Sequence, residues 1–266
     1  MTTAQALGGR TVVVTRAASQ AGDLIEALER YGASVISCPL IEIKEPDDFA
    51  RLDEAIEHLY GYDWIIFTSA NSVKFFLKRL SNKNVPHSEL DEIKVVAIGE
   101  STADKLRDEH VHVDVIPAVS RSEGVFSALI DFVGSEEKLA GLNFLMPRAA
   151  VARDYLPKAL EAANARVDVV TAYQNVIPKS LDRGKLSAML AGGADCIAFT
   201  SSSTVKNLAH LFDTNDLSEK LRGLAIACLG EITAETAKQF GLDPSIQPAA
   251  STMSEFAKAI ANHFAG

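Results

Sequence analysis

The decapeptide WIIFTSANSV (64–73) and its partner CIAFTSSSTV (196–205) decide the fold. In each, a short apolar run is followed by small polar residues, which is the pattern of a buried strand that gives way to a helix N-terminus. The two stretches lie 132 residues apart, close to half of the 266-residue chain. A strand-to-helix phrase repeated at that distance predicts two structurally equivalent halves.

Further phrases recur in the same order at nearly the same offset. They are TRAA (15–18) with PRAA (147–150), AIGESTA (97–103) with CLGEITA (228–234), and residues 117–133 with 248–264. Chance can produce one such match, but several matches in the same order at a nearly constant offset indicate an internal duplication.

Short apolar runs alternate with amphipathic helical patterns along the chain. Runs of about five apolar residues are typical of strands that helices cover on both faces. The helical pattern 21–32, for example, places Leu24, Ile25 and Leu28 on one face and ends at Gly32 as a C-cap. The predicted strands are 11–15, 34–38, 64–68, 94–98, 113–117, 143–147, 166–170, 196–200, 224–228 and 245–248. We therefore expect an α/β protein of two doubly wound parallel-sheet lobes.

Two extended stretches interrupt the alternation, CPLIEIKEP (38–46) and TAYQNVIPK (171–179). Each carries a proline near its end, which discourages a helix. Side by side they would form a two-stranded ribbon that takes the chain from one lobe to the other and back. The expected division is 1–38 with 176–266 as the first lobe, 44–170 as the second, and 39–43 with 171–175 as the ribbon. Two sequential halves remain the alternative.

The composition excludes several classes of function. A formal net charge of −9 argues against a nucleic-acid partner, because affinity for phosphate backbones requires clustered Lys and Arg. Cys38, Cys196 and Cys228 show no metal-binding spacing and are expected to be buried in a reducing compartment. The N-terminal residues show no secretory pattern, and no apolar run approaches the roughly 18 residues of a membrane span. We expect a cytoplasmic protein with no membrane partner.

The common signatures of cofactor and metal enzymes are missing. The sequence contains no GxGxxG, GxxxxGK[ST], HExxH or GxSxG motif. His110, His112 and Asp114 alternate along EHVHVD, but a metal site there would need further ligands, so surface histidines are the favoured interpretation. No metal and no cofactor are expected.

Small polar residues recur where strands end and helices begin. Each of them alone is explained by helix capping. Their gathering at the carboxyl ends of strands, where open α/β sheets bind ligands, favours a binding site built from helix N-termini. The candidate substrate-binding residues of this kind are Thr68, Ser69, Asn71, Ser72, Gly99, Thr102, Ser122, Thr200, Ser201, Ser202, Ser203, Gly230 and Thr233.

Arginines stand at matching places and favour a ligand with several carboxylates. Arg16 and Arg148 follow equivalent strands, Arg153 comes shortly after, and Arg121 lies beside the capping serines. An arginine guanidinium can bind a carboxylate with two hydrogen bonds, although solvated surface charges are the alternative for each.

Tyr173, in TAYQNV, is the candidate catalytic residue. A phenol can donate a proton to a leaving group, although packing on the ribbon is an equally good explanation of a tyrosine here.

Taken together, these phrases resemble the uroporphyrinogen-III synthase family. The resemblance rests on VVVTR (12–16), IIFTSANSV (65–73), AIGESTA (97–103), AYQNV (172–176), IAFTSSSTV (197–205), LGEITAE (229–235) and PAAST (248–252). It covers essentially the whole chain in order. Each motif is short, so the specificity lies in their succession.

The resemblance implies a cofactor-free cyclising lyase with two α/β lobes. Its substrate would be hydroxymethylbilane, a linear tetrapyrrole with eight carboxylates, and its product uroporphyrinogen III, formed with loss of water and inversion of ring D. In the family's proposed mechanism an azafulvene forms on ring A, ring D attacks it, and a spiro intermediate opens and recloses. The family tyrosine proposed to assist the departing hydroxyl falls at Tyr173, and two cleft threonines fall at Thr102 and Thr233.

The resemblance also bears on partners. We expect a monomer, with the enzyme that supplies hydroxymethylbilane as a candidate partner. The alternative function is a two-lobed protein that binds a small polyanion without chemistry. Such a protein would share the repeat, the ribbon and the capping hydroxyls, but receptors of that sort are usually exported.

Overall fold

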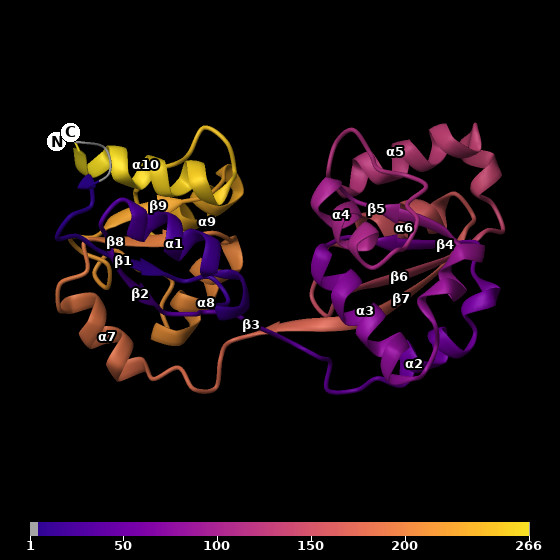
Figure 1. Cartoon of the computed structure of the whole chain (residues 1–266), viewed down its shortest axis with the longest axis horizontal. Coiled ribbons are helices and arrows are strands. Elements are labelled where there is room, and N and C mark those ends of the chain that lie inside the picture. The colour runs from indigo at the N-terminus through magenta and orange to yellow at the C-terminus, as the bar shows by residue number, and fades with distance from the viewer. Residues whose placement is uncertain (1–4, 266) are drawn as a thin grey trace. The chain divides into compact units, whose positions relative to one another are not determined.

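The computed structural model describes residues 5–265 and divides into two compact units. Unit 1 comprises Met1–Glu42 and Val176–Gly266, and unit 2 comprises Ile43–Asn175 (Figure 1). Both boundaries fall within a pair of hydrogen-bonded strands, β3 (Glu42–Lys44) and β7 (Arg166–Val176). The chain therefore leaves unit 1 through β3 and returns to it at the end of β7.

Unit 1 is built on a five-stranded sheet of order β10-β9-β8-β1-β2, whose strands pair in parallel. The strands are β1 (Thr11–Val14), β2 (Ser34–Ser37), β8 (Cys196–Phe199), β9 (Ala225–Cys228) and β10 (Pro244–Ile246). All four residues of the central strand β8 are buried, as expected for a strand covered on both faces.

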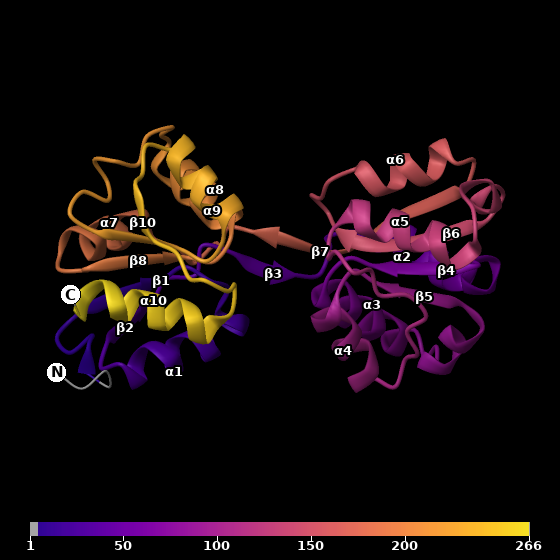
Figure 2. The same ribbon diagram turned by 90° about the horizontal axis from the view of Figure 1, so that it is seen from above.

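Among the described residues, five α-helices cover the two faces of this sheet. They are α1 (Gly22–Arg30), α7 (Arg183–Ala191), α8 (Ser202–Phe212), α9 (Glu231–Gln239) and α10 (Met253–Ala265). Helices α1 and α10 pack on one face, and α8 and α9 lie on the other (Figure 2). Helix α1 begins and ends close to its predicted bounds, and Gly32 follows it with a φ of +88°, a conformation that glycine adopts without strain.

Unit 2 repeats this architecture. Its sheet has the order β3-β7-β6-β4-β5, and its parallel strands include β4 (Trp64–Phe67), β5 (Lys94–Ala97) and β6 (Asn143–Ala149). Helices α2 (Ala50–Glu57), α3 (Ala70–Asn82) and α4 (Glu100–Asp108) pack on one face. Helices α5 (Ser122–Val133) and α6 (Tyr155–Ala162) pack on the other (Figure 2).

The duplication predicted from the sequence is visible in the order of the strands. At the sequence offset, β4 corresponds to β8, β5 to β9, β6 to β1 and β7 to β2, and these strands occupy the same order in the two sheets. Phe67 and Phe199 end equivalent strands and are both fully buried. Burial of each side chain stabilises its unit by roughly 1.5–3 kcal/mol.

One predicted strand does not form. Residues 113–117 make an isolated bridge between Val115 and Val96 instead of a ladder. Asp114 uses its side chain to accept a hydrogen bond from the Val95 amide, and Pro117 has no amide proton to donate. The run is therefore held beside β5 without becoming a full strand.

Candidate active site at the carboxyl ends of the strands

The N-terminus of α3 is closed by a reciprocal pair of serine hydrogen bonds. Strand β4 ends at Phe67, and Ser69 takes an extended conformation that makes it the N-cap of α3. The Ser69 Oγ accepts a hydrogen bond from the Ser72 amide at 3.0 Å, and the Ser72 Oγ accepts one from the Ser69 amide at 3.2 Å. A serine cap of this kind contributes about 1 kcal/mol to helix stability. Thr68 and Asn71, beside it, are half-buried.

Tyr173 lies on β7 against this helix. Its hydroxyl is 3.1 Å from the Ser69 Oγ, and its ring stacks on Phe75, with centroids 5.7 Å apart and an interplanar angle of 18°. Ala149 and Ala172 complete the small cluster around the ring, and Tyr173 is 7% exposed. The phenol is thus fixed at both its ring and its hydroxyl.

The N-terminus of α4 lies next to a second polar loop. Gly99 is the N-cap, and a Cβ at this position would lie 2.6 Å from the Ser120 Oγ. A larger residue at this position would require the Ser120 side chain to move. Thr102, in the first turn of α4, is only 2% exposed, so little of its side chain is accessible.

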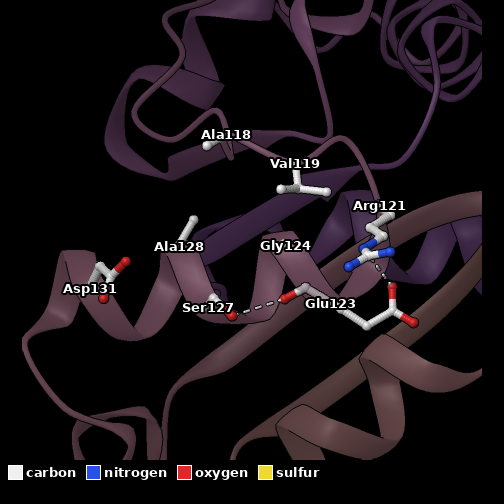
Figure 3. A pocket seen from close by; sticks show the side chains of 8 residues that line it. All are labelled: Ala118, Val119, Arg121, Glu123, Gly124, Ser127, Ala128 and Asp131. Carbon is white, nitrogen blue, oxygen red and sulfur yellow. Dashed lines mark hydrogen bonds and ion pairs between the residues drawn. The ribbon is translucent and has the colours of Figure 1, made fainter.

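A cavity of about 230 Å³ lies along the start of α5 (Figure 3). Ala118 and Val119 face the helix residues Gly124, Ser127 and Ala128 across it, and Arg121 stands at one end. Gly124 is required here, because a Cβ at this position would lie 2.0 Å from the Val119 carbonyl oxygen. Arg121 is the N-cap residue of α5, and its side chain is 68% exposed with Glu123 at 3.9 Å. Ser122 is half-buried.

Arg148 and Arg153 differ in what they contact. The guanidinium of Arg148 donates to the Arg153 carbonyl at 2.8 Å and to the Asp154 carboxylate at 2.6 Å, which fixes the loop after β6. The hydrogen bond from Arg148 holds the pKa of Asp154 below its usual value. Arg153 is an exposed residue of the same loop.

Unit 1 repeats the helix N-termini at its own sheet edge. Ser201 caps α8 by accepting a hydrogen bond from the Ser203 amide at 3.2 Å, and Gly230 is the N-cap of α9. Ser202, Ser203 and Thr200 are half-buried, whereas Thr233 is 6% exposed.

Arg16 corresponds to Arg148 and is held in a similar way. Its Nε donates to the Gln20 carbonyl at 2.9 Å. Burial lowers the pKa of this guanidinium from its usual value, and Asp23 partly offsets that effect. In both units, therefore, the arginine at the carboxyl end of the equivalent strand fixes the backbone of the loop that follows.

The cysteines and histidines take no part in these sites. Cys38, Cys196 and Cys228 are free and buried, as expected from the sequence. Among the described residues, 5–265 without the side chains of Lys185 and Ala191, no group of three or more His, Cys, Asp or Glu could hold a metal ion. His110 and His112 are exposed.

Phe75 is a further candidate residue, in contact with Tyr173, that sequence reasoning missed. It stands beside Phe76 in VKFFLK, and an adjacent pair of phenylalanines on a helix is read as core. Phe76 is fully buried in the core, while Phe75 turns to Tyr173. The signal available was that two neighbouring helix positions cannot face the same side.

Comparison with known proteins identifies the family. The family model of uroporphyrinogen-III synthase HemD matches residues 22–258. The chain belongs to the uroporphyrinogen-III synthase family. It is 32% identical over 239 residues to uroporphyrinogen-III synthase of Synechococcus elongatus, covering 88% of each chain. It is 30% identical over 255 residues to that of Chlorobaculum parvum, covering 95% of this chain and 98% of the relative.

Solved structures of uroporphyrinogen-III synthases share the fold. A mutant enzyme from Thermus thermophilus matches with a TM-score of 0.68 at 15% identity, covering 95% of this chain and 98% of the other. The Helicobacter pylori enzyme matches with a TM-score of 0.63 at 20% identity, covering 96% and 99%. The resemblance and the fold class drawn from the sequence are confirmed, and the alternative of a non-enzymatic binding protein is not supported. None of the helices described within residues 5–265 is long and apolar enough to span a membrane.

Proposed function

We propose that this chain is a uroporphyrinogen-III synthase, a lyase that cyclises hydroxymethylbilane with loss of water and inversion of ring D. Its membership of the uroporphyrinogen-III synthase family is the single observation that carries this assignment. The duplicated helix N-termini agree with a substrate that bears many carboxylates, because free amides and the positive end of the helix dipole stabilise anions.

The substrate carboxylates bind mainly to backbone groups at these helix N-termini. In unit 2 these are the N-termini of α3, α4 and α5, whose N-cap residues are Ser69, Gly99 and Arg121. In unit 1 the corresponding caps are Ser201 and Gly230. Half-buried side chains supply further hydrogen bonds to the substrate. They are the hydroxyls of Thr68, Ser122, Thr200 and Ser203 and the side-chain amide of Asn71.

The four arginines divide into two roles. Arg121 and Arg153 belong to exposed residues and are the candidates for direct contact with carboxylates. Arg16 and Arg148 act through the loops that they hold, since each donates to a backbone carbonyl a few residues downstream.

Tyr173 supplies the proton that turns the departing hydroxyl of ring A into water. The C–O bond breaks as its electron pair leaves on oxygen, and the ring becomes the azafulvene that ring D attacks. Opening and reclosure of the spiro intermediate inverts ring D, and the macrocycle releases a proton as it closes. Because the substrate is already reactive, most of the catalytic effect comes from positioning its ends, which can replace a large entropic barrier. No metal or cofactor is needed for these steps.

Separation of the product isomers tests this function. The protein is incubated with hydroxymethylbilane, and the porphyrinogens are oxidised and resolved by chromatography. Formation of isomer III in excess supports the proposal, whereas isomer I alone at the spontaneous rate refutes it.

We further propose a cytoplasmic monomer that receives its substrate from the enzyme making hydroxymethylbilane. Sedimentation velocity, alone and with that enzyme, tests the oligomeric state and the formation of a complex between the two.

A further inference from the structure

Helix α3 contacts Tyr173 through both its N-cap residue and its second turn. Ser69 reaches the phenolic oxygen at 3.1 Å, and Phe75 stacks on the ring with an interplanar angle of 18°. Ala149 and Ala172 belong to the same apolar cluster as Tyr173, and Ile43 packs against it. The helix that presents its N-terminus at the sheet edge therefore also sets the place of the phenol.

The hydrogen bonds of Ser69 allow either direction for its contact with Tyr173. A serine hydroxyl donates one hydrogen bond and accepts up to two. Ser69 Oγ accepts from the Ser72 amide at 3.0 Å, which leaves its own proton and one acceptor site for the Tyr173 hydroxyl. With Ser69 as the donor, the phenolic proton remains free for another group. If Tyr173 were the donor, its proton would be engaged within the protein.

The internal duplication separates this arrangement from ordinary capping. Unit 1 keeps the capping serine as Ser201, but Ile41 stands at the position equivalent to Tyr173 and Asn207 at the position equivalent to Phe75. Asn207 donates a hydrogen bond to the Leu40 carbonyl at 2.8 Å and so has a structural task. The architecture common to both units thus requires only the capping serine, whereas the stacked pair of Phe75 and Tyr173 is found in unit 2 and not at the equivalent positions of unit 1.

We propose that Ser69 is a positioning residue for the reaction, whose hydroxyl donates to Tyr173 so that the phenolic proton is directed to the departing hydroxyl of the substrate. Phe75 stacks on the Tyr173 ring and holds it in the orientation that this proton transfer requires. The inference rests on the proposed role of Tyr173. As the proton moves from Tyr173 to the leaving oxygen, which departs as water, the Ser69 hydroxyl stabilises the phenolate. The phenolate regains a proton when the macrocycle closes.

A double-mutant cycle tests this inference. The variants are Ser69→Ala, Tyr173→Phe and the double variant, assayed for formation of isomer III with kcat and KM determined separately. We expect Ser69→Ala to lower kcat about tenfold, the effect of one lost hydrogen bond, with KM within about twofold. In the Tyr173→Phe background the same change should alter kcat by less than about twofold, because the group that Ser69 serves is gone.

Two further variants separate the hydrogen bond from loss of the helix cap. Ser69→Thr keeps the hydroxyl and should restore most of kcat. Ser201→Ala removes the corresponding cap of unit 1 and calibrates the fall in melting temperature that a lost cap causes. An equal loss of kcat from Ser69→Ala in both backgrounds, or an unchanged kcat, would overturn the inference. Formation of isomer III by the unaltered protein decides the proposed function independently of these variants.

Discussion

The carboxylate of Asp195 accepts a hydrogen bond from the backbone amide of Thr11 at 2.8 Å, joining the start of β8 to the start of β1. The same contact recurs in unit 2, where Asp63 accepts from the Asn143 amide at 2.8 Å. The duplication therefore preserves the amino ends of the central strands as well as the polar carboxyl ends. Each aspartate precedes an interior strand of its sheet and contacts the first residue of the neighbouring strand, which comes from a distant part of the chain.

Asp195→Asn should destabilise unit 1. The hydrogen bond from the Thr11 amide, assisted by Arg10, holds the pKa of Asp195 below its usual value. A depressed pKa in the folded state contributes stability that is present above the unfolded value near 4 and is lost as the pH falls through the folded value. We expect a loss of about 1–2 kcal/mol in the free energy of unfolding at pH 7.

Denaturant unfolding from pH 7 to pH 3 checks this prediction. The difference between the protein and its Asp195→Asn variant should narrow below about pH 4, where the unfolded carboxylate becomes protonated. Asp243→Asn, at an exposed aspartate of the same unit, is the matched control and should have little effect. A difference that stays constant over this range of pH would contradict the assignment.

Gly124→Ala should disturb the loop before α5. The new methyl group would lie 2.0 Å from the Val119 carbonyl oxygen, so the loop and the helix must separate. Such overpacking costs about 1–3 kcal/mol, measurable as a fall in melting temperature. Gly22→Ala is the control at the start of α1, where a methyl group would meet nothing within 4 Å. That variant should be neutral or slightly stabilising, since alanine favours the helix. Equal melting temperatures for the two variants would show that the close approach is not maintained in solution.

Asp154→Asn should reproduce most of the effect of Arg148→Met. Both changes break the ion pair that holds the loop after β6, whereas direct binding of substrate by Arg148 would make only the arginine change harmful. We expect a KM several-fold higher in each variant, because the loop carries Arg153, and faster amide exchange in residues 149–153. A normal KM in Asp154→Asn beside a raised one in Arg148→Met would assign Arg148 to the substrate instead.

The three cysteines should resist thiol reagents in the folded protein. Burial raises the pKa of Cys38 to about 11 and the pKa values of Cys196 and Cys228 to about 12. At pH 8 each is therefore a neutral thiol, which is a poor nucleophile. Labelling with a disulfide reagent should be slow in buffer and complete in denaturant. Rapid labelling of any one of them under native conditions would mean that its surroundings open readily.

The fold followed from the sequence because apolar runs and their repeat carry long-range information. The strands predicted at 64–68 and 196–200 form as β4 and β8, which end one residue earlier, at Phe67 and Phe199. The prediction of a strand at 113–117 was wrong. Apolar character alone does not reveal that the Asp114 side chain binds the Val95 amide of β5, or that Pro117 has no backbone N–H to donate to a ladder.

The candidate site was less predictable, since a pattern identifies a residue type and not its partner. The sequence placed Ser69 at a helix start and Tyr173 on an extended stretch, but their contact depends on how α3 packs against β7. Arg148 likewise resembled a free cation after a strand, while its partners Arg153 and Asp154 became evident only from the path of the following loop.

The most direct test of the account is the bond that ring D forms. Hydroxymethylbilane is labelled with ¹³C at the hydroxymethyl carbon and at the free α-carbon of ring D, and the product is examined by NMR. With inversion of ring D these two carbons are not bonded, so we predict a product without one-bond coupling between them. A product that shows this coupling, formed at the same rate with and without the protein, would contradict the assignment of this chain as a uroporphyrinogen-III synthase.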